Sequence, residues 1–102
     1  MRIIQETALT AAARAYPDAA AALGSRMRSV RATGWQSLTE ARGTYPHADA
    51  VRVASGRTAI AFNIGGNKYR LITDLHFARG TAYILCFLTY ADYSKDRWKS
   101  VL

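Results

Sequence analysis

The sequence predicts an α+β fold, and two observations lead to this prediction. Helical periodicity is confined to the first half of the chain, up to about residue 43, and to a short segment after residue 89. Strand-like alternation of apolar and polar residues fills most of residues 58–88. Helices segregated from a run of consecutive strands are typical of α+β proteins. We therefore expect N-terminal helices on one face of a small, mainly antiparallel twisted sheet, with a short helix at the C-terminal end.

The totals restrict the class of protein. At 102 residues the chain is expected to be one domain, residues 1–102. Its 14 basic and 7 acidic residues give a net charge of +7, which favours a polyanionic partner, either nucleic acid or an acidic protein, over a merely soluble basic surface. The single cysteine, Cys86, excludes a disulfide framework and is expected to be a buried, reduced thiol. No signal-like or membrane-spanning run is present, so a cytoplasmic protein without membrane contact is expected.

Two helices are expected near the N-terminus, after a short apolar edge strand at residues 2–4. The first spans residues 6–16, and Pro17 interrupts it because proline is acceptable in a first helical turn but not in an interior. The second begins near Asp18, which suits the positive end of a helix, and runs to about Ala32. Their buried faces are predicted to contain Leu9, Ala12, Ala13 and Tyr16, and then Ala20, Leu23, Met27 and Val30.

The second of these helices carries three arginines in its second half. Arg28 and Arg31 are neighbours on the helix surface, whereas Arg26 lies apart from them. Such a run is typical of a solvated face, and a binding surface for RNA or for an acidic partner is the alternative.

Capping and turn signals mark further elements. Ser37 and Glu40 have the spacing of a capping box, which predicts a short third helix. Ser55-Gly56 indicates a turn before the main strands. Thr89 and Asp92 repeat the capping spacing, which predicts that a short helix begins at Tyr90. The apolar run between the last turn and this helix, residues 82–88, is expected to be an interior strand.

The central element is predicted to be a β-hairpin over residues 58–77. Alternation in its first strand is followed by Gly65-Gly66, which can adopt the positive φ angles of a tight two-residue turn. Alternation in the second strand separates two faces. One face is predicted to contain Tyr69, Leu71, Leu75 and Phe77, and the other Lys68, Arg70, Asp74 and His76 together with Ile72.

The residues that can carry chemistry are cations and phenols. The sequence has no cluster of histidine, cysteine or carboxylate residues and no phosphate-binding glycine loop, so no metal site is expected. RNA cleavage without a metal needs one group that accepts the 2′-hydroxyl proton, one that protonates the leaving 5′-oxygen, and cations beside the phosphate. Lys68 and Arg70, two residues apart on one strand face, are predicted to reach the same phosphate. The alternative is that both belong to a solvated sheet face.

The hairpin also carries a resemblance. Residues 62–71, Phe-Asn-Ile-Gly-Gly-Asn-Lys-Tyr-Arg-Leu, resemble a motif of the HigB toxins, which belong to the RelE-like superfamily of type II toxin–antitoxin systems. Further agreement follows the chain at Met1-Arg2-Ile3-Ile4, Tyr16-Pro17-Asp18-Ala19, Trp35, Tyr45-Pro46-His47-Ala48-Asp49, Leu88 to Tyr93 and Trp98-Lys99. The resemblance implies a RelE-like fold in which helices cover one face of the sheet and the other face is left open as a concave floor.

A second constellation, Thr89-Tyr90-Ala91-Asp92-Tyr93, resembles the Thr-His-Ala-Glu-Tyr segment that is common in HigB-like toxins. Tyr90 stands in place of the family's histidine and Asp92 in place of its glutamate, while Tyr93 is retained. A tyrosine exchanges protons near neutral pH less readily than a histidine does. Tyr90 is therefore expected either to take part in proton transfer or to stack on a base, and simple packing of both tyrosines at the sheet edge is the alternative.

The resemblance implies a toxin that cleaves mRNA, as a rule on the ribosome, without a cofactor. A cognate helix-turn-helix antitoxin would silence it, and operator DNA would be reached only through that antitoxin. The predicted catalytic residues are Lys68, Arg70, Tyr90 and Tyr93, and the predicted RNA-binding residues are Asn67, Arg79, Lys95 and Lys99. Two alternatives remain: a catalytically weak or inactive module of the same fold that binds RNA or the antitoxin, and an unrelated small basic protein of the translation apparatus.

Overall fold

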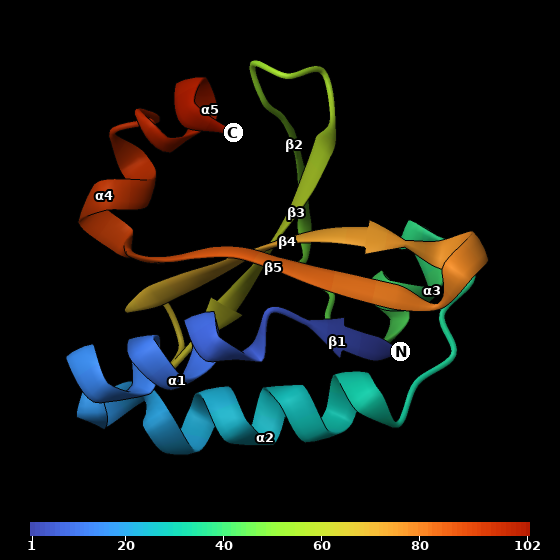
Figure 1. Ribbon diagram of the computed structural model, residues 1–102, viewed down its shortest axis with the longest axis horizontal. Coiled ribbons are helices and arrows are strands. Elements are labelled where there is room, and N and C mark those ends of the chain that lie inside the picture. Colours follow the sequence, from blue (N-terminus) through green and yellow to red (C-terminus); the bar gives the residue numbers. More distant parts are fainter.

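The computed structural model describes all residues, 1–102, and shows helices packed against a five-stranded sheet (Figure 1). The predicted α+β fold is confirmed. The helices are α1 (Glu6–Ala15), α2 (Ala20–Arg31), α3 (Leu38–Thr44), α4 (Tyr90–Ser94) and α5 (Trp98–Val101), with 3-10 turns at Pro17–Ala19 and Phe77–Arg79. The strands are β1 (Arg2–Ile4), β2 (Asp49–Arg52), β3 (Thr58–Ile64), β4 (Tyr69–His76) and β5 (Thr81–Thr89).

The sheet has the strand order β1-β5-β4-β3-β2. All neighbouring strands are antiparallel except β1, which pairs parallel to β5 at one edge. This arrangement confirms that the N-terminal segment is an edge strand and that β5 lies in the interior of the sheet. Because β5 has a strand on each side and side chains packed on both faces, it can be apolar almost throughout.

The first two helices cover one face of the sheet, where they lie side by side (Figure 1). Leu9 and Ala12 of α1 and the Leu23, Met27 and Val30 line of α2 are buried in the main core, as their spacing predicts. Ala13 and Tyr16, which are also predicted to be buried, are only partly buried, and a further difference lies at the start of α2. Ala19 is buried and Ala20 is exposed, because the 3-10 turn before α2 winds more tightly than an α-helix and changes which residue faces the sheet.

The arginines of α2 do not form one continuous surface. The Arg26 guanidinium lies 4.0 Å from the centre of the Tyr45 ring, and burial lowers its pKa. Arg31 forms an ion pair with Glu6 of α1. The predicted separation of Arg26 from its neighbours is thus confirmed, and Arg26 contributes to packing against α3 and the sheet.

Both predicted capping signals form. The Ser37 hydroxyl accepts a hydrogen bond from the Glu40 N–H at 3.3 Å and begins α3. The Thr89 hydroxyl accepts one from the Asp92 N–H at 3.2 Å and begins α4. Each bond satisfies one of the four N–H groups that a helix leaves unpaired at its start. The second cap fixes the point at which β5 ends and the chain turns across the sheet.

The face of the sheet opposite α1 and α2 is called the second face below. The resemblance implies that this whole face is an open floor, but in the structure only part of the face is open. A second cluster of buried apolar residues occupies its middle, and Trp98 of α5 covers this cluster while remaining only 6% exposed. The members of the second cluster are Val53, Ala59, Ala61, Ile72 and Trp98. The C-terminal helices therefore close part of the second face and leave a narrower opening.

The β3–β4 connection differs from the predicted two-residue turn. Ile64 pairs with Tyr69, so residues 65–68 form a four-residue loop. Gly65 and Gly66 do adopt positive φ angles of 62° and 69°, as expected for glycines in a turn. The two additional residues, Asn67 and Lys68, belong to the loop and not to the strand, which changes the direction in which Lys68 points.

Candidate active site

A groove of about 720 Å³ opens on the second face, between the β3–β4 hairpin, α4 and the segment that leads from α3 into β2. We call it the Arg70 groove. It has polar and charged walls and lies beside the second cluster. Its lining residues are Arg42, Pro46, His47, Ala48, Asp49, Ala61, Asn63, Asn67, Arg70, Tyr90 and Tyr93.

Arg70 lies on β4 directly opposite Asn63 of β3 and is only 8% exposed. A buried guanidinium needs compensation for the water it loses. One of its nitrogens, Nη1, donates a hydrogen bond to the Tyr69 carbonyl oxygen at 3.0 Å. Its central carbon lies 5.0 Å from the ring centre of Tyr90 and 5.4 Å from that of Tyr93, within the range of cation–π attraction.

Arg70 also keeps donors for a ligand. A guanidinium carries five N–H donors in a planar fork that matches pairs of phosphate oxygens. Only Nη1 of Arg70 has a hydrogen-bond partner within the chain, and no buried side-chain nitrogen or oxygen of the protein lacks one. The other nitrogens of Arg70 are therefore open to the groove. No carboxylate of the chain forms an ion pair with this arginine.

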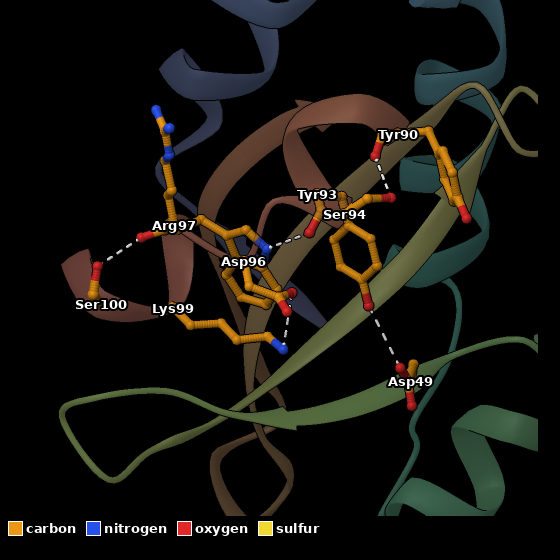
Figure 2. Close-up of polar contacts among 9 residues, drawn as sticks. Asp49, Tyr90, Tyr93, Ser94, Asp96, Arg97, Lys99 and Ser100 are labelled. Carbon is orange, nitrogen blue, oxygen red and sulfur yellow. Dashed lines mark hydrogen bonds and ion pairs between the residues drawn. The ribbon is translucent and has the colours of Figure 1, made fainter.

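Tyr93 is held in place from both sides. Its hydroxyl group donates a hydrogen bond to Asp49 Oδ2 at 3.4 Å, across the groove from α4 to β2 (Figure 2). Its ring stacks on Trp98 with the ring centres 5.4 Å apart, and Trp98 Nε1 donates to the Tyr93 carbonyl oxygen at 3.1 Å. Burial raises the pKa of Tyr93, and the negative charge of Asp49 raises it further against the smaller opposing effect of Arg70. The Tyr93 phenol thus keeps its proton at neutral pH.

Tyr90 is the exposed partner of this pair. It is the first residue of α4 and its side chain is 51% exposed. Its backbone N–H donates to the Lys68 carbonyl oxygen at 2.9 Å, which ties the start of α4 to the β3–β4 loop. The backbone of Tyr90 is therefore anchored, and its ring lies beside Arg70 while half of the residue remains exposed to solvent. This is the arrangement of a platform on which a planar ligand can stack.

The structure brings together four of the residues predicted from the sequence. Arg70, Tyr90 and Tyr93 line one groove, and Asn67 joins them from the loop, where its side-chain oxygen accepts a hydrogen bond from Asn63 Nδ2 at 3.5 Å. The alternative that both tyrosines merely pack at the sheet edge does not describe Tyr90, which is half exposed beside a cation.

Lys68 is a correction. It does not share a strand face with Arg70, because the four-residue loop places it outside β4. Its side chain is 72% exposed and its Nζ lies 4.0 Å from Asp18 Oδ2, near the helical layer. The same carboxylate accepts hydrogen bonds from the Tyr69 hydroxyl group at 2.8 and 2.9 Å, and these raise the pKa of Tyr69. Lys68 is therefore absent from the lining of the Arg70 groove.

The three other predicted RNA-binding residues lie outside the groove. Lys95 and Lys99 each form a local ion pair, with Asp92 at 3.8 Å and with Asp96 at 3.0 Å (Figure 2 shows the second pair). Arg79 belongs to the 3-10 turn that follows β4, at the other end of that strand from Arg70. A role for these residues requires an RNA that extends well beyond a single phosphate.

Sequence reasoning missed four groove residues. Asn63 follows from alternation in β3, since Ala61 and Asn63 share the second face. Arg42, His47 and Asp49 come from the segment that joins α3 to β2, and only the three-dimensional fold brings this segment beside α4. The order of an exposed His47, a buried Ala48 and an exposed Asp49 is a local signal that His47 and Asp49 share one side. Nowhere in the chain do three or more His, Cys, Asp or Glu side chains group as a metal site requires.

The fold and the groove define a class: a small basic α+β domain in which a sheet carries an arginine between two phenols. Residues 19–96 match the family model of HigB_toxin, the RelE-like toxic component of a toxin–antitoxin system. The chain therefore belongs to the HigB toxin family, and the resemblance found in its hairpin is confirmed. It is 27% identical over 95 residues to the mRNA interferase HigB of Escherichia coli O6:H1 (strain CFT073), a match that covers 93% of this chain and 90% of that protein. None of its helices has the length and apolar character needed to cross a membrane.

Proposed function

We propose that this toxin is a metal-independent endoribonuclease that cleaves mRNA on the ribosome and thereby inhibits translation. The observation that carries the proposal is Arg70, a largely buried arginine with unused N–H donors and no carboxylate partner, set between two aromatic rings at the side of an open groove. The name of the Escherichia coli relative, mRNA interferase, supports the same reaction.

The groove residues suit binding of the phosphate and of a base during cleavage by the RNA's own 2′-hydroxyl. Arg70 would bind the scissile phosphate and stabilise the charge that develops on its oxygens as the 2′-oxygen attacks. Tyr90 would stack on a neighbouring base, because a base presents a π-face of matching size. Tyr93 keeps its proton, so it acts as a hydrogen-bond donor and not as a base. The reaction would yield a 2′,3′-cyclic phosphate and a 5′-hydroxyl end.

The proposed partners follow from the family and the charge. Membership in a toxin–antitoxin family implies an antitoxin. We propose a helix-turn-helix antitoxin that carries the pair to operator DNA, with no direct contact between this chain and the operator. The net charge of +7 favours association with mRNA and ribosomal RNA in the cytoplasm. Lys68, Lys95, Lys99 and Arg79, which lie outside the groove, would contribute phosphate contacts of this kind.

Primer extension on an mRNA, with and without programmed ribosomes, tests the proposal. Wild-type protein should produce cuts only when ribosomes are present. Arg70→Ala should reduce cleavage by about 10²–10³-fold, the usual cost of losing one donor that stabilises an oxyanion. Arg14→Ala is the matched control, since it removes an exposed arginine of α1 on the far side of the sheet from the groove. Equal cleavage by Arg70→Ala and wild type would refute the role of the groove.

A second candidate is a binding module of the same fold. The observation in its favour is Tyr90, a phenol at the position where HigB-like toxins commonly have a histidine. This module would bind RNA or the antitoxin in a salt-sensitive manner and cut nothing. Intact mRNA in every lane, from protein that is folded and still binds RNA, would favour this candidate over the nuclease.

A further inference from the structure

The cleavage proposed above needs a group that gives a proton to the leaving 5′-oxygen near neutral pH. The ionisable side chains that line the Arg70 groove are two arginines, two tyrosines, one aspartate and one histidine. Guanidinium groups keep their protons and carboxylic acids have already lost theirs at neutral pH, while phenols release a proton only near pH 10. The raised pKa of Tyr93 makes that phenol a still weaker acid. A histidine is the one type of side chain in the groove that loses and regains a proton in this range.

That histidine, His47, comes from the segment between α3 and β2, which is fixed on both sides. The Ala48 N–H donates to the Tyr45 carbonyl oxygen at 3.0 Å, and Arg42 Nε donates to the Ala48 carbonyl oxygen at 3.0 Å. Ala48 itself is only 3% exposed and packs in the main core. His47 is thus held on the groove wall by a rigid backbone, although it is an exposed side chain.

The His47 imidazole is also uncommitted. It takes part in no side-chain hydrogen bond, ion pair or aromatic pair within the protein, whereas the other histidine, His76, contacts both Asp74 and Tyr83. Two residues further along, Asp49 lines the same groove and accepts the hydrogen bond of Tyr93. His47 and the Arg70–Tyr93 pair therefore line one groove.

We propose that His47 is the general acid of the cleavage reaction and supplies the proton transfer that Tyr90, at the family's histidine position, does not. The 2′-oxygen would attack the phosphorus and release its proton to water in the open groove. The bond from phosphorus to the 5′-oxygen would break, and the 5′-oxygen would take a proton from the His47 imidazolium. The neutral imidazole would then regain a proton from solvent. This inference rests on the proposed nuclease function.

The test compares His47→Ala and His47→Gln with His76→Ala, which removes the other histidine from the far end of the sheet. Single-turnover cleavage is measured on ribosome-bound mRNA with an ordinary scissile phosphate and with sulfur in place of the leaving 5′-oxygen. A thiolate leaves without protonation, so it makes a general acid unnecessary. On the ordinary mRNA both His47 variants should be slower by about 10²-fold or more, the usual contribution of general acid catalysis. On the sulfur-containing mRNA they should cleave as fast as wild type.

The outcomes separate this inference from the function on which it rests. If wild type cuts neither mRNA, the proposed nuclease function fails and the inference falls with it. If wild type cuts and the His47 variants cut the ordinary mRNA equally well, only the assignment of His47 fails. Slow cleavage of both mRNAs by the His47 variants would also overturn the assignment. Loss of a general acid alone would slow only the mRNA with the ordinary leaving oxygen. His47 is exposed, so unchanged thermal unfolding of the variants is expected and confirms that they are folded.

Discussion

The two ends of β4 carry charged residues on the same second face, but the charges have different surroundings. At one end Arg70 has no carboxylate partner and lies between Tyr90 and Tyr93. At the other end the Asp74 carboxylate lies 3.1 Å from His76 Nε2 and 3.7 Å from Arg57 Nη1. The cation at the first end is thus without an anionic partner, whereas the charges at the second end largely neutralise one another. Alternating charge in a strand therefore does not by itself distinguish a binding site from a set of paired charges, and the lack of a carboxylate partner is what favours Arg70 as a ligand-binding residue.

The second cluster separates these two ends. Ile72 lies between Arg70 and Asp74 on β4 and is completely buried, and Trp98 covers it from the C-terminal helix. Because Trp98 also stacks on Tyr93, the same side chain closes the middle of the second face and supports the wall of the groove. The separation of the two ends can therefore be tested by replacing Trp98, by measuring the reactivity of Cys86, and by replacing Asp74.

The largest effect is expected from Trp98→Ala. Truncation of a buried tryptophan usually costs about 3–5 kcal/mol, since it removes apolar contacts and leaves a cavity. Denaturant unfolding should show a loss of this size for Trp98→Ala, whereas Val101→Ala, in the same helix but 82% exposed, should change little. Equal stability of the two variants would mean that α5 does not hold the second face closed and that the two ends of β4 are not separated by a sealed cluster.

The thiol of Cys86 packs against the same cluster and is partly buried, not fully buried as the sequence predicts. Cys86 pairs with Ile72 across β4 and β5, and burial raises its pKa to about 11 from the ordinary value of 9.0. At pH 8 this lowers the thiolate fraction by about 100-fold, and the thiolate is the reactive form. Alkylation of the folded protein should therefore be about 100-fold slower than that of the protein unfolded in urea.

The sign of the accompanying pH effect on stability can be derived from the same shift. Between pH 9 and about 11 the unfolded chain loses the thiol proton while the folded chain retains it. The Cys86 contribution to stability is thus intact below pH 9 and decreases as the pH rises toward 11.

The alkylation experiment also has an outcome that would contradict the prediction. If the folded protein is alkylated as fast as the unfolded protein, the second cluster is open to solvent at Cys86.

Much of the fold is predictable from local sequence, because the signals that specify it are local. The capping residues Ser37 and Thr89 bond to N–H groups three residues away, and alternation in β3 and β4 assigns each side chain to a face. The length of the β3–β4 loop does not follow from local sequence, since two glycines fit a two-residue turn and a longer one equally well. A two-residue turn would place Lys68 on the face of Arg70, whereas the four-residue loop keeps Lys68 outside β4.

Only part of the candidate site can be predicted from local sequence, because some of its residues are brought together by the order of strands in the sheet. Arg70, Tyr90 and Tyr93 lie on or beside two neighbouring strands, so one motif and one cap suffice to bring them together. Asp49 and His47 reach the groove because β2 joins the far side of β3, and this contact depends on the order of strands in the sheet. The β-bulge opposite Ile72 and Thr73 is also non-local, since it shifts which residues of β5 face each side.

The smallest effect is expected at the self-neutralised end, from Asp74→Asn. The Asp74 side chain is 20% exposed, and both of its partners are more exposed than it is. Partly exposed ion pairs of this kind contribute about 1 kcal/mol or less, so unfolding by denaturant should change by no more than that. Cleavage of ribosome-bound mRNA should match wild type, because the charge that is lost lies across the second cluster from Arg70. A decrease comparable to that of Arg70→Ala would instead mean that substrate extends along the whole of β4 and that its two ends form one surface.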